Sequence, residues 1–283
     1  MTDKRHSYTC FAHGSTFGAF AAIFWLICGA PVVLAQDSQI DESLDGGWFG
    51  GSQAYDLCIT AVEMDPDDGF ERSLSWQAQG GGPPAEHCGI LALVALELFA
   101  EAASRLDAMA QSNSNGLGAD IRAQLLVQAS SAWMLEGFPQ QALESLRAAE
   151  ALEPASTRIN LDIHFDRARA HSMDANWALA IESLDQALLI APFAQDALVL
   201  RATGNRALGQ INEALADLTR VLNDDPEYAP AYLERGVLKR LEGETDGARA
   251  DWIRVLMIEP EGELADAARA HLHDLDFPDG LTE

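Results

Sequence analysis

Positive charge is scarce in this sequence. Its 283 residues include 18 lysines and arginines against 44 aspartates and glutamates, which gives a formal net charge of −26. A surface this acidic repels phosphate backbones and anionic lipid head groups, which excludes nucleic acid and lipid as main partners. Aromatic residues make up only 7% of the chain. Alanine and leucine abound instead, so an all-β protein is disfavoured and helices are expected.

Motifs for catalysis and metal binding are also missing. The sequence contains no G-x-x-x-x-G-K-[ST], G-x-S-x-G, H-E-x-x-H or C-x-x-C pattern. His164 and His171 lie seven residues apart on one expected helix, but zinc would need further ligands, so packing is the favoured interpretation. His271 and His273 are expected to be exposed to solvent. We therefore predict no catalytic residue, no cofactor and no metal.

A long apolar run occurs only near the N-terminus. Lys4 and Arg5 precede a mostly apolar stretch that ends at Ala35, with compact residues at the positions that signal peptidase reads. This pattern predicts a signal peptide, residues 1–35, cut after Ala35, and a periplasmic or secreted mature protein with no membrane insertion. The alternative is a retained anchor, because about 18 apolar residues can just span a bilayer. Pro31 and the cleavage sequence favour removal.

Cysteines are few, and cleavage would halve their number. Of the 4 cysteines, Cys10 and Cys28 lie in the expected signal peptide, which leaves Cys58 and Cys88. Two cysteines in an oxidising compartment predict a disulfide, whereas two free buried thiols are the alternative. The formal net charge changes only from −26 to −27, because two basic residues and one acidic residue are removed.

A repeat of 34 residues dominates the C-terminal half. The positions that are identical under this shift are Arg201/Arg235, Gly209/Gly243, Ala214/Ala248, Asp217/Asp251, Arg220/Arg254, Val221/Val255, Leu222/Leu256 and Pro226/Pro260. An earlier unit ends at Pro192 in the same register, and another ends at Pro154, four residues further away than the repeat requires. Periods of this length indicate a solenoid of stacked supersecondary units.

Each unit is expected to form two helices. In the last unit apolar and small residues recur every three or four positions before and after a break at Gly243, and Pro260 ends the second helix. These units resemble tetratricopeptide repeats (TPRs). The residues that carry the resemblance best are Tyr232, Gly236, Ala248, Trp252 and Pro260, with Leu198, Ala202, Ala214, Leu218 and Pro226 in the unit before. The unit from Leu161 departs from the pattern, with His164 at the aromatic position and Ala175 at the turn glycine.

The resemblance implies an all-α fold, a right-handed α-solenoid of stacked helix-turn-helix units. The N-terminal sequence and the repeats together divide the chain into a signal peptide (1–35), a flexible tether (36–51), degenerate N-terminal TPR-like helices (52–122), four TPR units (123–156, 161–194, 195–228 and 229–260), a capping helix (261–276) and a loose tail (277–283). In this layout Cys58 and Cys88 lie on helices that run the same way, at heights that differ by about 3 Å. A bridge is allowed if these helices are neighbours, with Cα atoms within about 7 Å.

In TPR proteins the first helix of each unit lines a concave groove. The corresponding candidates for partner binding here are Phe165, Arg169, Met173, Val199, Thr203, Arg206, Leu233, Val237 and Arg240. Arg206 and Arg240 occupy equivalent positions, which predicts a basic, partly apolar trough suited to a peptide with acidic groups. The alternative is that these residues only pack helix against helix. A second column consists of Arg167, Arg201 and Arg235. It is interpreted as internal, with Arg201 bound to Asp217 and Arg235 to Asp251, and the alternative is a ladder for the carboxylates of a partner.

The predicted function is that of a non-enzymatic adaptor that binds an unidentified protein or peptide. By analogy with exported TPR proteins, envelope assembly or secretion is the expected setting. One alternative is a structural spacer that self-associates into a homo-oligomer. Another is an enzyme with its site in residues 36–122, a stretch that contains one histidine, His87, and no catalytic motif.

Overall fold

The computed structural model describes residues 52–112 and 116–277. The expected signal peptide, its cleavage site, the tether and the tail beyond Phe277 lie outside these residues. Thirteen helices and no strands occur in the described part. They are α1 (Gln53–Met64), α2 (Pro66–Ala78), α3 (Gly82–Ala95), α4 (Phe99–Gln111), α5 (Ala119–Leu135), α6 (Pro139–Glu150), α7 (Thr157–Met173), α8 (Trp177–Ile190), α9 (Gln195–Ala207), α10 (Ile211–Asp224), α11 (Ala229–Leu241), α12 (Thr245–Ile258) and α13 (Glu263–Asp276).

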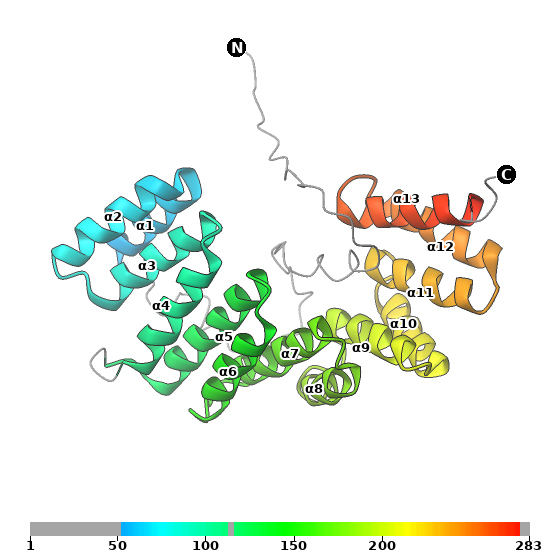
Figure 1. Cartoon of the computed structure of the whole chain (residues 1–283), viewed down its shortest axis with the longest axis horizontal. Coiled ribbons are helices and arrows are strands. Elements are labelled where there is room, and N and C mark those ends of the chain that lie inside the picture. The colour runs from blue at the N-terminus through cyan, green and yellow to red at the C-terminus, as the bar shows by residue number, and fades with distance from the viewer. Residues whose placement is uncertain (1–51, 113–115, 278–283) are drawn as a thin grey trace, which may run out of the picture.

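The helices stack in chain order into an open arc (Figure 1). Figure 1 shows α5 and α7 on the inner side of the arc and their partners α6 and α8 on the outer side. The helix α9 packs on α11 as α5 packs on α7, so the first helices of the units form an inner layer and the second helices an outer layer. Thus the predicted all-α solenoid of helix-turn-helix units is confirmed.

The four units correspond to the pairs α5/α6, α7/α8, α9/α10 and α11/α12, although two of them start earlier than predicted. The first starts at Ala119 rather than at 123, and the second starts at Thr157 rather than at 161. The hydroxyl of Ser156 accepts a hydrogen bond from the Ile159 backbone N–H at 3.4 Å and caps α7. The four extra residues thus add one turn to the start of α7.

The turn between the two helices of a unit requires a left-handed residue. Gly137, Gly209 and Gly243 occupy this position with φ of 86°, 75° and 82°. The α7/α8 unit has Ala175 there instead, with φ of 55°. A side chain in this conformation is strained, so this turn is formed at a cost that the other three avoid.

Close packing inside a unit depends on matched residue sizes. Trp252 of α12 is fully buried, and its indole lies against Gly236 of α11, where a Cβ atom would collide with it. In the unit before, the equivalent pair is Leu218 and Ala202, both fully buried. The larger tryptophan is therefore accommodated by the loss of a methyl group from the facing helix.

The two ends of the array differ. A capping helix covers the C-terminal end, and helices with a weaker repeat pattern form the N-terminal end. Leu264 and Ala268 of α13 are buried with Trp252 and Val255, so α13 caps the last unit as predicted. At the other end Cys58 of α1 and Cys88 of α3 are buried together with Val62.

Candidate functional site

The nine candidates for partner binding lie on α7, α9 and α11, in the inner layer. Arg240 is exposed and the other eight are half-buried. Phe165 and Val199 pack against one core, and Leu233 and Val237 against the core around Trp252. These side chains therefore pack between helices and still present part of their surface to the inside of the arc.

Two arginines of the predicted basic trough are neutralised by the chain itself. Arg206 forms an ion pair with Glu234 of the next first helix, with 2.5 Å between Nε and Oε1. Arg169 forms an ion pair with Asp166 at 2.9 Å. In the described part of the chain no carboxylate lies within 4 Å of the Arg240 guanidinium. The trough is thus less basic than the sequence predicts, and its accessible positive charge lies at Arg240.

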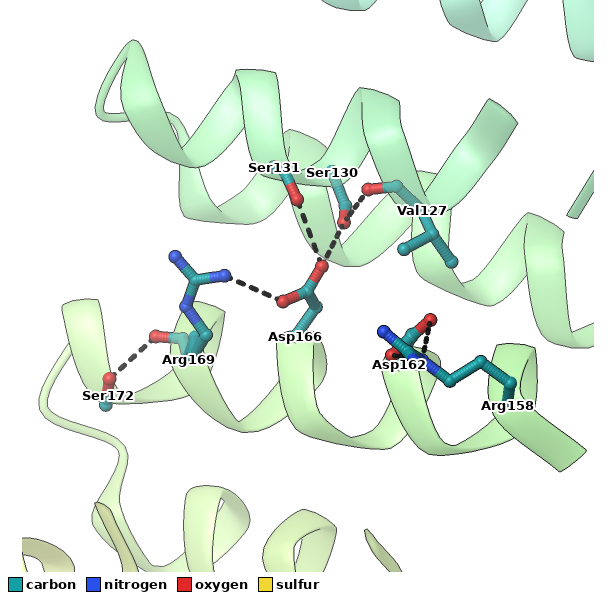
Figure 2. Close-up of polar contacts among 8 residues, drawn as sticks. All are labelled: Val127, Ser130, Ser131, Arg158, Asp162, Asp166, Arg169 and Ser172. Carbon is teal, nitrogen blue, oxygen red and sulfur yellow. Dashed lines mark hydrogen bonds and ion pairs between the residues drawn. The ribbon is translucent and has the colours of Figure 1, made fainter. Parts of the chain in front are cut away.

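Asp166 is the centre of a polar cluster that joins two first helices (Figure 2). Its carboxylate, in a residue only 6% exposed, accepts hydrogen bonds from Ser131 at 3.1 Å and Ser130 at 3.4 Å, both on α5. Arg169 donates to its other oxygen at 2.9 Å, as Figure 2 shows. A buried carboxylate needs such partners, so this cluster fixes α5 against α7 on the inner face.

Asp162 lies one turn before Asp166 on α7 (Figure 2). The pKa of Asp162 is raised to about 6, first by burial and also by the charge of Asp166, while Arg158, at 3.2 Å, opposes the shift. The inner face of α7 therefore carries a carboxyl group that changes charge close to neutral pH.

A second polar chain joins the first helices near the N-terminal end. The Tyr55 hydroxyl lies 2.7 Å from His87 Nδ1, and His87 Nε2 lies 2.9 Å from Gln128 Oε1, which links α1, α3 and α5. Burial lowers the pKa of His87, and burial also raises the pKa of Tyr55 to about 12. A neutral imidazole held between a phenol and an amide positions helices without carrying charge.

Cys58 and Cys88 lie beside this chain in disulfide geometry. Their Cα atoms are 6.3 Å apart, within the range that a bridge requires. The helices that carry them are neighbours, as the predicted layout requires. Oxidation of the pair stays a prediction, tested below.

His271 departs from the expectation for the capping helix. Its ring stacks on Trp252, with centroids 4.8 Å apart and 16° between the planes. The pKa of His271 is lowered, first by burial and then by the charges of Arg240 and Arg206, while Asp274 opposes the shift. The prediction that this histidine is solvated is therefore wrong, although the side chain of His273 is 70% exposed.

His164 and His171 both lie on α7. Burial lowers the pKa of both His164 and His171, and the Nδ1 atom of each is buried without a hydrogen bond within the described part.

The described residues contain no group of three His, Cys, Asp or Glu side chains that could hold a metal ion. Likewise, none of the helices described is long and apolar enough to cross a membrane.

No family model and no curated protein matches the sequence of this chain. Solved structures do match. The C-terminal part of a TPR repeat-containing protein from Cytophaga hutchinsonii superposes with a TM-score of 0.56 and 14% identity, over 79% of this chain and 89% of that one. This chain has the TPR fold.

Two further TPR structures resemble it. A thermophilic TPR protein from Thermus thermophilus matches with a TM-score of 0.51 and 17% identity, over 65% of this chain and 95% of that one. YrrB, described as a TPR protein with an unusual peptide-binding site, matches with a TM-score of 0.49 and 16% identity, over 71% and 97% of the two chains.

Proposed function

We propose that this TPR solenoid is an exported, non-enzymatic adaptor that binds a protein or peptide segment along its inner layer. The proposed setting is the bacterial periplasm, in envelope assembly or secretion. The segment carries an acidic group together with apolar side chains.

The observation that carries the proposal is the exposed arginine on α11. Leu233, Val237 and Arg240 follow one another at helical spacing, so they share one face. The first two are half-buried, and Arg240 has no carboxylate of the described residues within 4 Å. In a chain with 44 acidic and 18 basic residues, most guanidinium groups are already paired. An accessible guanidinium beside apolar surface suits a carboxylate from a partner.

Export is supported by the sequence of residues 1–35. The test is the intact mass of the protein recovered from the periplasm of a bacterial host. A chain that starts at Gln36 is expected. Recovery of the full-length chain in the membrane fraction would instead favour the retained anchor.

The adaptor role is tested by recovery of partners from an envelope extract with the wild type, Arg240→Glu and Arg147→Glu. Arg147 is the matched control, because it is exposed on α6 and no described carboxylate lies within 4 Å of its guanidinium. We expect one stoichiometric partner with the wild type and Arg147→Glu, and at least about tenfold less with Arg240→Glu, as for loss of a charge-assisted hydrogen bond. Equal recovery with all three proteins would overturn the inner-layer assignment.

A self-associating spacer is the second candidate. Its distinguishing result is a homo-oligomer in size-exclusion chromatography with no foreign protein recovered. The net charge of −26 opposes the close approach of two copies, so we expect a monomer. An enzyme with its site in residues 36–122 would instead turn over a substrate in a manner that depends on His87.

A further inference from the structure

A shallow depression lies in the outer layer, on the side of the molecule away from the proposed groove. It has a volume of about 420 Å³ and lies between the turn after α8 and the helix α10. The residues that line it are Phe193, Ala216, Thr219, Arg220, Asn223 and Asp224. The Phe193 side chain forms one wall of the depression, although the residue is 63% exposed.

Arg220 covers Phe193, and no hydrogen bond joins its guanidinium to another residue that the structure describes. Its guanidinium carbon lies 4.5 Å from the centroid of the Phe193 ring, in a cation–π contact. A guanidinium that stacks through its face keeps its in-plane N–H groups available at its edge. Over the described ranges no carboxylate lies within 4 Å of Arg220, and the residue is exposed.

In the next unit, the arginine equivalent to Arg220 lies beside a carboxylate of the chain itself. Thirty-four residues further on, Arg254 takes the place of Arg220 and Glu227 takes the place of Phe193. Arg254 lies 3.7 Å from the carboxylate of Glu227. The fold therefore admits a carboxylate beside this arginine, and at Arg220 the chain supplies an exposed aromatic ring instead.

We propose that this depression binds a protein segment in which a carboxylate lies next to an apolar side chain. The carboxylate contacts the edge of Arg220, as Glu227 contacts Arg254, and the apolar side chain covers the ring of Phe193. Asp224, one turn after Arg220 on α10, repels a second carboxylate, which sets the orientation of the segment. The site is independent of the inner layer, so the solenoid can hold two segments at once.

The test is selection of a random peptide library, displayed on phage, on the protein that starts at Gln36. Phage that also bind the Phe193→Glu variant are removed first. This variant copies the pair of the next unit, so it fills the site without altering the fold, which circular dichroism checks. We expect the selected peptides to share an Asp or Glu adjacent to an apolar residue.

One synthetic peptide from this selection is then titrated. We expect at least about tenfold weaker binding to Phe193→Glu and Arg220→Gln, and the same loss when the acidic residue of the peptide is replaced by its amide. Binding to Arg240→Glu is expected to be unchanged, which separates this site from the groove. The Glu227→Phe variant should bind two peptides rather than one. Failure to enrich any acidic peptide, or equal affinity for wild type and Phe193→Glu, overturns the proposal.

Discussion

Arg235 and Asp251 face each other across the α11/α12 hairpin, with guanidinium nitrogens 2.8 and 2.7 Å from the two carboxylate oxygens. Lys239 approaches the same carboxylate at 2.8 Å, and the Asp251 side chain is only 6% exposed. Arg201 and Asp217 repeat the arrangement one unit earlier, at 2.8 and 2.7 Å. The predicted pairing is thus confirmed, and these arginines bind carboxylates of the chain itself; Arg201 also contacts Asp185 of the previous unit at 2.6 Å.

Loss of this pair should destabilise the array. Asp251→Ala leaves Arg235 and Lys239 without their shared partner, so we expect the free energy of unfolding to fall by about 1–3 kcal/mol. Urea denaturation measures it. Glu101→Ala is the control, because its pair with Arg105 is exposed, and a change within about 0.5 kcal/mol is expected. Equal losses in the two variants would contradict a special role for the hairpin pair.

The contact between Gly236 and Trp252 predicts a second effect. Gly236→Ala places a methyl group against the indole, so we expect a loss of about 1–3 kcal/mol from overpacking. Gly247→Ala is the matched control, since there a Cβ atom would meet only the ends of flexible side chains, Lys239 at 3.1 Å and Glu244 at 3.6 Å. That variant should be neutral or slightly more stable, because alanine favours helix. Identical melting curves for the two variants would show that the close approach is relaxed in solution.

A substitution at Ala175 should stabilise the protein, in contrast to the two substitutions above. Because its φ of 55° is costly for a residue with a Cβ atom, Ala175→Gly is expected to raise the free energy of unfolding by about 1 kcal/mol. Gly209→Ala, the reciprocal change in the next unit, should lower it by a similar amount. Thermal unfolding of both variants, compared with the wild type, provides the measurement, and a stabilised Gly209→Ala would refute the turn assignment.

The Cys58–Cys88 pair can be tested by counting thiols. In the protein that starts at Gln36, denatured without reductant, we expect no free thiol. Reduction should then lower the free energy of unfolding by about 2–4 kcal/mol, because the bridge restricts the unfolded chain. A Cys58→Ser, Cys88→Ser double variant should not respond to reductant. Two titratable thiols in the untreated protein would rule out the bridge.

Asp162 should make stability depend on pH. Its pKa is about 6 in the folded protein against 3.8 as the reference, so the folded state binds the proton more tightly. The resulting stabilisation is complete below about pH 4 and is lost as the pH rises through 6. Asp162→Asn should abolish this part of the dependence, as measured by denaturation between pH 4 and pH 7. An unchanged slope would mean that Asp162 titrates normally.

The repeat period made much of this structure predictable. Arg235 and Asp251 recur together with Arg201 and Asp217, so their pairing follows from the sequence, as do the left-handed turns at Gly209 and Gly243. Contacts between neighbouring units at spacings other than 34 residues were harder to predict. Arg206 meets Glu234 over 28 residues rather than 34, and side-chain direction, which sequence spacing does not specify, decides that pair.

Other features lie outside the repeat altogether. His271 belongs to the capping helix, and its stacking on Trp252 has no counterpart in an earlier unit that could have revealed it. The extra turn of α7 was also missed, because a polar stretch near Ser156 fits an interrupted unit as well as a capped helix. Its only local signal was the serine, a residue preferred at helix starts.

The helix α7 belongs to two hydrophobic cores at once, and this affects the order in which the protein unfolds. Ile159 and Ile163 belong to the core that extends back to Ile90, whereas Ala168 belongs to the core that extends forward to Leu238. In a stacked array each unit is stabilised by its neighbours only. The two halves can therefore open separately, and amide hydrogens of α7 should exchange last, since both halves must open before this helix is released.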